Sequence, residues 1–470
     1  MATERKNEFI TSLVTEKSPF ITTDEVISWL SERNRKVNVV VKKIAFNQLK
    51  NWRFSKEKGN LAHVSGRFFS IEGIKVKTNW GKVPEWEQPI INQPEIGYLG
   101  ILTKEFNGIL YFLMQAKIEP GNVNYVQLSP TLQATKSNYL QVHQGERPLY
   151  FEYFQNATKD QILLDQLQSE QGARFLRKRN RNIIIKVNDD IKVYENFIWL
   201  TLGQIKELIK KDNLVNMDTR TVISGIPFDS SLNVSLPPEI KDNLLINSFK
   251  TDMFLSAIEK ETGLYTFNDI LNWLTALKCK YDLNINPVSL YDIRDWYITD
   301  REIRHRNNNY FNVVAVEVEI GNREVQRWTQ PLIEPVQIGL IAFIVKKINN
   351  VIHFLVQAKL ECGNFDILEM APTVQCLTGG YANSKDLPFL DTVLNAKKSQ
   401  IRYNTLQSEE GGRFFKEQNR NMIIEADEAF PDEVPENYIW ATLNQLNTFL
   451  RFNNYLNIQA RSLISSINFI

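Results

Sequence analysis

The feature that most constrains this chain is a polar stretch that it contains twice. The first copy begins at Gln115-Ala-Lys-Ile-Glu119 and the second at Gln357-Ala-Lys-Leu-Glu361. The two copies lie 242 positions apart, and the same separation still holds between Tyr139 and Tyr381. A repeat of this length predicts two similar structural units within one chain.

A second motif repeats downstream at a slightly different spacing. Gln168-Ser-Glu-Gln-Gly172 with Arg174 recurs as Gln407-Ser-Glu-Glu-Gly411 with Arg413, now 239 positions apart. Pro227, Pro237 and Pro238 flank a Ser- and Asn-rich run between the copies, which is typical of a linker. We therefore expect a first unit over residues 1–225, a linker over 226–245 and a second unit over 246–470.

Each half reads as strand-rich. In the run 311–320, Val316 and Val318 alternate with Glu317 and Glu319, which indicates a half-buried strand. Apolar runs before and after Asn107-Gly108 indicate two strands joined by a tight hairpin. No βαβ pattern occurs, so we expect an α+β fold in which each unit is a mixed sheet with flanking helices.

Composition excludes several classes of partner. Hydrophobic residues make up 43% of the chain, charged residues 23%, and the net charge is +1, which gives no reason to expect nucleic acid or a membrane. No apolar run is long enough to span a bilayer. Three cysteines without framework spacing favour a reducing compartment, so we expect the cytoplasm.

The repeated polar residues are candidates for ligand binding and catalysis. Arg174 and Arg413 could each bind a diphosphate through a planar guanidinium, and the repeated Thr and Gln side chains could hydrogen-bond sugar hydroxyls or a base edge. Glu170 and Glu409 are candidates for general acid or base, and Tyr139 and Tyr381 for donors to a developing oxyanion. Some of these residues could equally cap turns or join strands. Trp52 and Trp296, near strand ends, could stack on a ring of the ligand or pack in the core.

Signatures of metal and phosphate-loop sites are absent from the sequence. The four histidines do not cluster with cysteines or acids at ligand spacing, and neither Gly-x-Gly-x-x-Gly nor a Walker-type loop occurs. Cys362 and Cys376 have no counterpart in the first copy, so we interpret them as packing thiols. The residues therefore indicate neither a metal site nor a site for nicotinamide or a P-loop nucleotide.

The twin blocks resemble the NDP-hexose 2,3-dehydratase family over nearly the whole chain. The blocks are Leu128-Ser-Pro-Thr-Leu-Gln-Ala-Thr-Lys-Ser-Asn-Tyr139 with Leu167-Gln-Ser-Glu-Gln-Gly172, and Met370-Ala-Pro-Thr-Val-Gln375 with Leu406-Gln-Ser-Glu-Glu-Gly411. The resemblance implies two tandem Nudix-like modules, a homodimer and a sugar-nucleotide pocket in each module. It also implies loss of water across C2 and C3 of a dTDP-4-keto-6-deoxyhexose without a cofactor, giving the 3,4-diketo-2,6-dideoxy sugar.

Carried onto this chain, the resemblance gives two sets of candidate residues and leaves open which pocket is catalytic. The second copy has Leu377-Thr-Gly-Gly380 where a Thr-Pro-Gly-Asn type of turn would be expected. The first set is Trp52, Ser129, Pro130, Thr131, Gln133, Thr135, Asn138, Tyr139, Gln168, Ser169, Glu170 and Arg174. The second set is Trp296, Ala371, Pro372, Thr373, Gln375, Tyr381, Gln407, Ser408, Glu409, Gly411 and Arg413.

The substrate's chemistry suggests the steps. The C4 ketone acidifies the C3 proton, so a base generates an enolate that needs donors at the C4 oxygen. The C2 hydroxyl then leaves with help from an acid, and the enol tautomerises. Two other functions stay open on the residues alone: a metal-dependent Nudix-type pyrophosphohydrolase and a non-catalytic double sugar-nucleotide-binding module.

Overall fold

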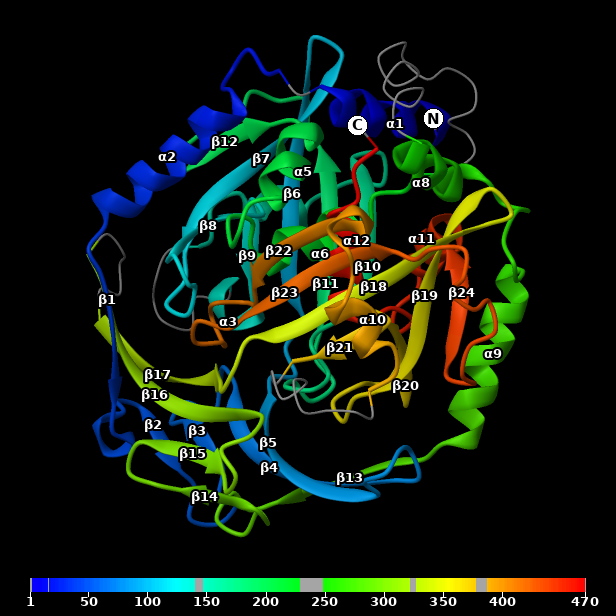
Figure 1. Ribbon diagram of the computed structural model, residues 1–470. Helices are drawn as coiled ribbons and strands as arrows, with labels where there is room; N and C mark the ends of the chain where they lie inside the picture. The colour runs from blue at the N-terminus through cyan, green and yellow to red at the C-terminus, as the bar shows by residue number, and fades with distance from the viewer. Residues whose placement is uncertain are drawn as a thin grey trace.

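The computed structural model of the chain describes residues 2–15, 17–139, 147–228, 248–321, 327–377 and 387–469. Each half of the chain supplies one large sheet and most of one small sheet, with helices packed around them (Figure 1). The prediction of an α+β fold with mixed sheets in two repeated units is confirmed.

The first half contains six helices, one 3₁₀ turn and twelve strands within the described residues. These are α1 (Ala2–Val14), α2 (Thr23–Lys36), β1 (Val39–Ile44), η1 (Phe46–Gln48), β2 (Trp52–Phe54), β3 (Leu61–His63), β4 (Ser70–Thr78), β5 (Glu85–Asn92), β6 (Gly97–Phe106), β7 (Ile109–Ile118), β8 (Val126–Ser129), β9 (Leu132–Ala134), α3 (Lys136–Tyr139), α4 (Phe151–Gln155), β10 (Ile162–Ser169), β11 (Arg179–Lys186), β12 (Phe197–Leu200), α5 (Leu202–Ile209) and α6 (Met217–Ser224).

The second half repeats most of this order. Its elements are α8 (Ser248–Ile258), α9 (Phe267–Lys280), β13 (Leu283–Val288), β14 (Trp296–Ile298), β15 (Glu302–His305), β16 (Phe311–Ile320), β17 (Arg327–Pro335), β18 (Gly339–Ile348), β19 (Val351–Leu360), β20 (Leu368–Ala371), β21 (Val374–Cys376), α10 (Leu390–Leu394), η4 (Lys398–Gln400), β22 (Ile401–Ser408), β23 (Gln418–Glu425), β24 (Tyr438–Thr442), α11 (Leu443–Phe449) and α12 (Ile458–Ser465).

The large sheets are mixed. In the first half the strand order is β10-β11-β6-β7-β12, with β8 beside β7 and β9 beside β6. Only the β6–β11 pair is parallel among the described pairs of this sheet. The β6–β7 hairpin turns at Asn107 and Gly108, whose φ values are 51° and 78°. Two successive positive φ values are typical of a two-residue hairpin, as the sequence predicts.

The small sheets exchange one strand between the halves. Strand β1, from the first half, pairs antiparallel with β16, so that Val41 lies opposite Val318. Strand β13, from the second half, pairs with β4, so that Ile285 lies opposite Val76. Each small sheet is therefore completed by the other half of the chain. The predicted boundaries at 225 and 246 stay a prediction, because most of the linker lies outside the described residues.

The halves also share their hydrophobic core. The largest cluster of buried apolar side chains contains residues of both, such as Phe112 and Phe354 at equivalent positions of β7 and β19. Helix α6 packs on α12 between the two large sheets. Burial of such a shared core holds the halves in one fixed arrangement, because apolar area removed from water is the main favourable term in folding.

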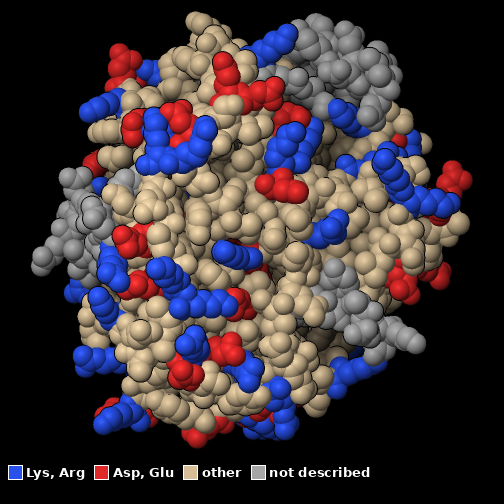
Figure 2. Space-filling model, turned by 60° about the vertical axis from the view of Figure 1, so that its left-hand side comes forward, with Lys and Arg blue, Asp and Glu red and all other residues tan. Residues whose placement is uncertain are grey.

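The surface gives no sign of a single-sign patch on the face drawn in Figure 2, where basic and acidic side chains lie interspersed. Among the helices of the described residues, none is long and apolar enough to cross a bilayer.

Candidate active site

The repeated polar stretch of each half meets the Gln-Ser-Glu turn of the other half. The N–H of Gly121 donates to the carbonyl oxygen of Gly411 at 2.8 Å, and the N–H of Gly363 donates to that of Gly172 at 2.7 Å. Two clusters of polar side chains form where these backbones meet, and each is built from both halves.

We call the group around the first meeting the first cluster. It draws on the end of β7, on β9, on the turn after β10, on α6 and on the turn between β22 and β23. Its members act electrostatically on one another. They are Lys117, Glu119, Gln133, Glu170, Lys178, Asp218, Glu410 and Arg413.

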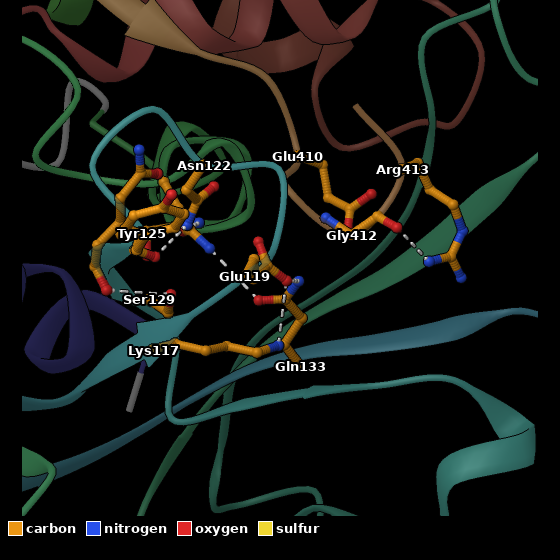
Figure 3. A network of polar contacts seen from close by, with 12 residues as sticks. Lys117, Glu119, Asn122, Tyr125, Ser129, Gln133, Glu410, Gly412 and Arg413 are labelled. Atoms are coloured by element: carbon orange, nitrogen blue, oxygen red, sulfur yellow. Dashed lines mark hydrogen bonds and ion pairs between the residues drawn. The ribbon is translucent and has the colours of Figure 1, made fainter. Parts of the chain in front are cut away.

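Gln133 and Glu119 are hydrogen-bonded to each other within the first cluster (Figure 3). Gln133 Nε2 donates to Glu119 Oε1 at 2.7 Å, and Lys117 Nζ lies 3.5 Å from the same oxygen. Asn216, the N-cap of α6, donates to Gln133 Oε1 at 3.3 Å. The amide of Gln133 is thereby fixed in orientation, since one end donates and the other accepts.

Glu410 and Arg413 reach the first cluster from the second half, as Figure 3 shows. Glu410 Oε1 accepts from the N–H of Gly412 at 2.9 Å. Burial, and then the nearby Glu119 carboxylate, raises the pKa of Glu410 to about 7. The Arg413 guanidinium lies 4.4 Å above the ring of Phe69, so a residue just before β4 of the first half supports an arginine of the second.

Glu170 and Lys178 face each other at the end of the β10–β11 ladder. The N–H of Glu170 donates to the carbonyl oxygen of Lys178 at 2.9 Å, and Asn180 Nδ2 donates to Glu170 Oε2 at 2.8 Å. Burial raises the pKa of Glu170, whereas burial lowers the pKa of Lys178 to about 8. Groups tuned toward neutrality from both sides suit proton transfer.

Asp218 adds a fourth carboxyl group to the first cluster. It lies in the first turn of α6 and is 2% exposed. Burial, and then the Glu410 carboxylate, raises its pKa well above the usual range. Several carboxyl groups held this close cannot all ionise at once, so the cluster retains protons near neutral pH.

The second cluster is the counterpart in the other half. Gln375 Nε2 donates to Glu361 Oε1 at 2.8 Å, and Asn457 donates to Gln375 Oε1 at 2.7 Å. Asn419 donates to Glu409 Oε1 at 2.7 Å. Burial, and then Glu417, raises the pKa of Glu409 to about 8. The members are Lys359, Glu361, Gln375, Glu409, Glu417, Gln459, Gln171 and Arg174.

The clusters differ at three equivalent positions. Where the first has Glu410 and Asp218, the second has the amides Gln171 and Gln459; where the first has Lys178, the second has Glu417. The first cluster also reaches the surface, because Lys117, Gln133, Glu410 and Arg413 are partly exposed, whereas Gln375, Gln171 and Arg174 are buried. The first cluster thus has both more ionisable groups and better access.

Two buried arginines fix the turns that carry the glutamates. Arg220, on α6, donates to the carbonyl oxygen of Ser408 and to Ser462 Oγ. Arg461, on α12, donates to the carbonyl oxygen of Ser169 and, at 2.9 Å, to Thr221 Oγ1. Each arginine is 1% exposed and holds the turn of the opposite half.

The structure assigns the two predicted arginines to the opposite clusters. We expected Arg174 in the first set and Arg413 in the second, but Arg413 lies in the first cluster and Arg174 in the second. Arg174 lies 4.1 Å above the ring of Phe311, on a strand of the other half. The grouping was wrong because the turn crosses to the other half, which spacing along the chain does not reveal.

Several predicted residues make hydrogen bonds within the sheets or between the two halves of the chain. Thr131 and Thr373 each donate to a backbone carbonyl of the hairpin and accept from a backbone N–H at 2.9 Å. Gln168 and Gln407 each donate at 2.7 Å to a backbone carbonyl of the other half. The other predicted residues of these segments are also buried. They are Ser129, Pro130, Ser169, Ala371, Pro372 and Ser408.

The two predicted tryptophans lie outside both clusters. Trp52 and Trp296 are each 7% exposed and belong to a buried apolar cluster shared by the small sheets. Trp52 packs on Phe69, and Trp296 packs on Phe311, with ring centroids 4.8 and 4.9 Å apart. They therefore support the phenylalanines on which Arg413 and Arg174 rest.

Helix α3 lies beside the first cluster. Ser137 Oγ donates to Glu95 Oε2 at 2.7 Å, and Lys178 Nζ donates to the carbonyl oxygen of Glu95. Tyr139 stacks on Phe151 at 4.7 Å, and burial, then Tyr98, raises its pKa. Thr135 Oγ1 lies 3.3 Å from Ser137 Oγ. The side chain of Asn138 and all of Tyr381 lie outside the described residues.

Sequence reasoning missed Glu119, Lys178, Asp218 and Glu410. Glu119 and its counterpart Glu361 stand inside the repeated stretch itself, so their duplication was a usable signal. The other three differ between the copies, and a search for shared residues passes over them. Within the described residues, no group of three or more His, Cys, Asp or Glu side chains has the arrangement of a metal site.

Comparison with known proteins gives one consistent result. The family model described as NDP-hexose 2,3-dehydratase matches residues 23–226 and again 267–467. A relative from Saccharopolyspora spinosa is 44% identical over 475 residues, covering 100% of this chain and 96% of the relative. One from Amycolatopsis orientalis is 43% identical, covering 95% and 90%, and one from Streptomyces violaceoruber is 40% identical, covering 94% and 96%. All three are named dTDP-4-dehydro-6-deoxy-alpha-D-glucopyranose 2,3-dehydratase.

Proposed function

The chain belongs to the NDP-hexose 2,3-dehydratase family and is a sugar-nucleotide 2,3-dehydratase, a carbon–oxygen lyase; we propose that its first cluster removes water from dTDP-4-keto-6-deoxyglucose. The names of three full-length relatives support the substrate. The product is the corresponding 3,4-diketo-2,6-dideoxy sugar nucleotide.

The observation that carries the choice of the first cluster is the difference between the two. Acid–base elimination needs groups that take up and release protons near neutral pH. Glu410 and Asp218 supply such groups in the first cluster, whereas Gln171 and Gln459 do not titrate. The exposure of the side chains favours the same choice, because Glu410 is partly exposed whereas its counterpart Gln171 is buried.

In the proposed reaction the Glu170 carboxylate removes the C3 proton. Burial makes a carboxylate more basic, and burial is the largest cause of the raised pKa of Glu170, although Lys178 and Arg461 act against it. Asn180 donates to one of its oxygens and the N–H of Gln171 to the other, which holds the carboxylate in place. The enolate then expels the C2 hydroxyl group.

Tyr139 is proposed as a donor to the C4 oxygen as negative charge develops there. It is partly exposed at the end of α3, next to the segment that holds Ser137 against Glu95. Gln133 and Arg413 are proposed to bind the sugar nucleotide, since both are partly exposed and they reach the first cluster from different halves of the chain. In the second copy of the repeat, Tyr381 and Glu409 correspond to Tyr139 and Glu170, and we propose no role for them in the reaction.

We further propose that each unit is Nudix-like and that the protein is a cytoplasmic homodimer. The resemblance of the twin blocks supports the Nudix-like units and the homodimer, and sparse cysteines fit a reducing compartment. Sedimentation equilibrium tests the dimer: a mass of one 54.7 kDa chain would contradict it.

Three amide variants test the assignment of the cluster. Glu170→Gln is expected to lower kcat by about a hundred- to ten-thousand-fold, and Glu410→Gln by about tenfold or more. Glu409→Gln, which changes the equivalent acid of the second cluster, should stay within about tenfold of the natural protein. Product from dTDP-4-keto-6-deoxyglucose is followed by mass spectrometry. A larger loss for Glu409→Gln than for Glu170→Gln would move the reaction to the second cluster.

A further inference from the structure

The first cluster contains a buried cation, Lys178, that the reaction described above does not use. Lys178 precedes β11 and is 5% exposed. The carbonyl oxygen of Glu95 is its one hydrogen-bond acceptor among the described residues. An ammonium group has three donors, so two remain for a ligand.

The position of Lys178 is fixed from two sides. Its carbonyl oxygen accepts the N–H of Glu170 at 2.9 Å, which places it opposite the proposed base. Its Nζ is held against the backbone of Glu95, whose carboxylate is in turn bound by Ser137. A buried ammonium is costly unless neighbouring charges offset the cost, and Glu170 and Glu410 provide that charge.

The equivalent position of the other half carries the opposite charge. Glu417 occupies it, is 2% exposed and faces Arg174. A lysine at one copy and a glutamate at the other cannot both serve the same structural purpose. The difference is therefore expected to concern the reaction that only the first cluster carries out.

We propose that Lys178 is the acid that protonates the departing C2 hydroxyl group. This inference rests on the proposed function, because it assumes that the substrate lies in the first cluster. Elimination beside a ketone needs an acid as well as the base Glu170, and among the titrating groups of the first cluster Lys178 is the one that lies across the β10–β11 ladder from Glu170. An ammonium whose pKa is lowered to about 8 is protonated at neutral pH yet gives up its proton more readily than an ordinary lysine.

The steps balance without another reagent. Glu170 takes the C3 proton, and the C–H electron pair forms the enolate with negative charge on the C4 oxygen. As that ketone reforms, the pair makes the C2–C3 double bond, the C2–O bond breaks, and Lys178 gives its proton to the hydroxide, which leaves as water. The neutral amine then takes the proton of the C3 enol hydroxyl, Glu170 returns its proton to C2, and both residues are restored.

A substrate with a leaving group that needs no acid tests the proposal. With dTDP-4-keto-6-deoxyglucose, Lys178→Met should lower kcat by about a hundredfold or more. With the 2-deoxy-2-fluoro analogue, which loses fluoride, the same variant should stay within about threefold of the natural protein. Lys178→Arg keeps a charge and a donor for Glu95 but does not deprotonate, so it should be as slow as Lys178→Met on the hydroxy substrate.

Two control variants separate the possible failures. Glu170→Gln should block both substrates; if it eliminates fluoride at the natural rate, the first cluster is not the site and the proposed function fails. Glu417→Gln, the matched change in the second cluster, should leave both rates within about threefold.

Three outcomes would overturn the role of Lys178 itself. They are equal losses on both substrates, full activity of Lys178→Arg, and a change confined to KM, which would indicate a contact to the diphosphate instead.

Discussion

Gly121 and Gly411 approach each other so closely that neither position has room for a side chain. The N–H of Gly121 donates to the carbonyl oxygen of Gly411 at 2.8 Å. A Cβ on Gly121 would lie 1.6 Å from the carbonyl oxygen of Phe414, and one on Gly411 would lie 2.2 Å from Asn122 Oδ1. This contact sets how near Glu410 of one half comes to Glu119 of the other.

Replacing Gly121 by alanine should therefore separate the two halves at the first cluster. The obstacle is backbone, which cannot rotate away, so we expect a loss of about 1–3 kcal/mol or more in the free energy of unfolding and at least a tenfold loss of kcat. Urea unfolding and the dehydration assay measure the two effects. Gly321→Ala is the control, because among the described residues its Cβ would meet only Asn38 O, at 3.9 Å. Natural stability and rate in Gly121→Ala would show that the contact is not needed.

The exchanged strand β1 allows a test of the sheet pairing. Lys43 lies opposite Val316, just as Pro287 of β13 lies opposite the equivalent residue Ile74. Proline has no N–H, so this position of the ladder does not use one. Lys43→Pro should cost less than about 1 kcal/mol, whereas Lys42→Pro should cost about 1–3 kcal/mol by removing a ladder hydrogen bond. Equal costs in chemical denaturation would speak against the pairing of β1 with β16.

Lys206 should make stability depend on pH. It lies in α5, is 3% exposed and donates to the carbonyl oxygen of Ser465. Burial lowers its pKa from 10.5 to about 7. Between these values the unfolded chain holds a proton that the folded protein has released, so folding becomes more favourable as pH rises from about 7 toward 10.5.

Lys206→Met should remove that contribution. The stability of the variant relative to the natural protein is expected to be greatest near pH 6 and to shrink as pH rises toward 10. Unfolding by urea at pH 6, 8 and 10 measures the difference at each pH. A difference that is constant or grows with pH would mean that the amine is not destabilised by burial.

Glu417 should make the stability of the protein fall as pH rises, which is opposite to the effect of Lys206. Burial raises its pKa from 4.5 to about 7, against the lowering effect of Arg174. The folded protein therefore keeps a proton that the unfolded chain has lost, and stability falls as pH rises from about 4.5 through about 7. Glu417→Gln should be more stabilising at pH 8 than at pH 5 in thermal unfolding. Equal shifts in melting temperature at both pH values would contradict the raised pKa.

Hydrogen bonds within the sheets and between the two halves explain why so many repeated polar residues lie outside the two clusters. Thr131 and Gln168 satisfy buried backbone groups, which would otherwise cost free energy in the core. Duplication preserves such residues as faithfully as it preserves functional ones. The residues that differ between copies, Lys178 against Glu417 and Glu410 against Gln171, carry more information about where the reaction occurs.

The sequence by itself determined the two units, the hairpin at Asn107-Gly108 and the mixed α+β character, because these depend on local patterns and on the repeat. Only the tertiary structure decided that β1 and β13 each pair with a strand of the other half of the chain. It also decided that Arg413 lies in the first cluster and Arg174 in the second. The physical reason is that periodicity tells which face of a strand or turn is buried, but not which half of the chain buries it.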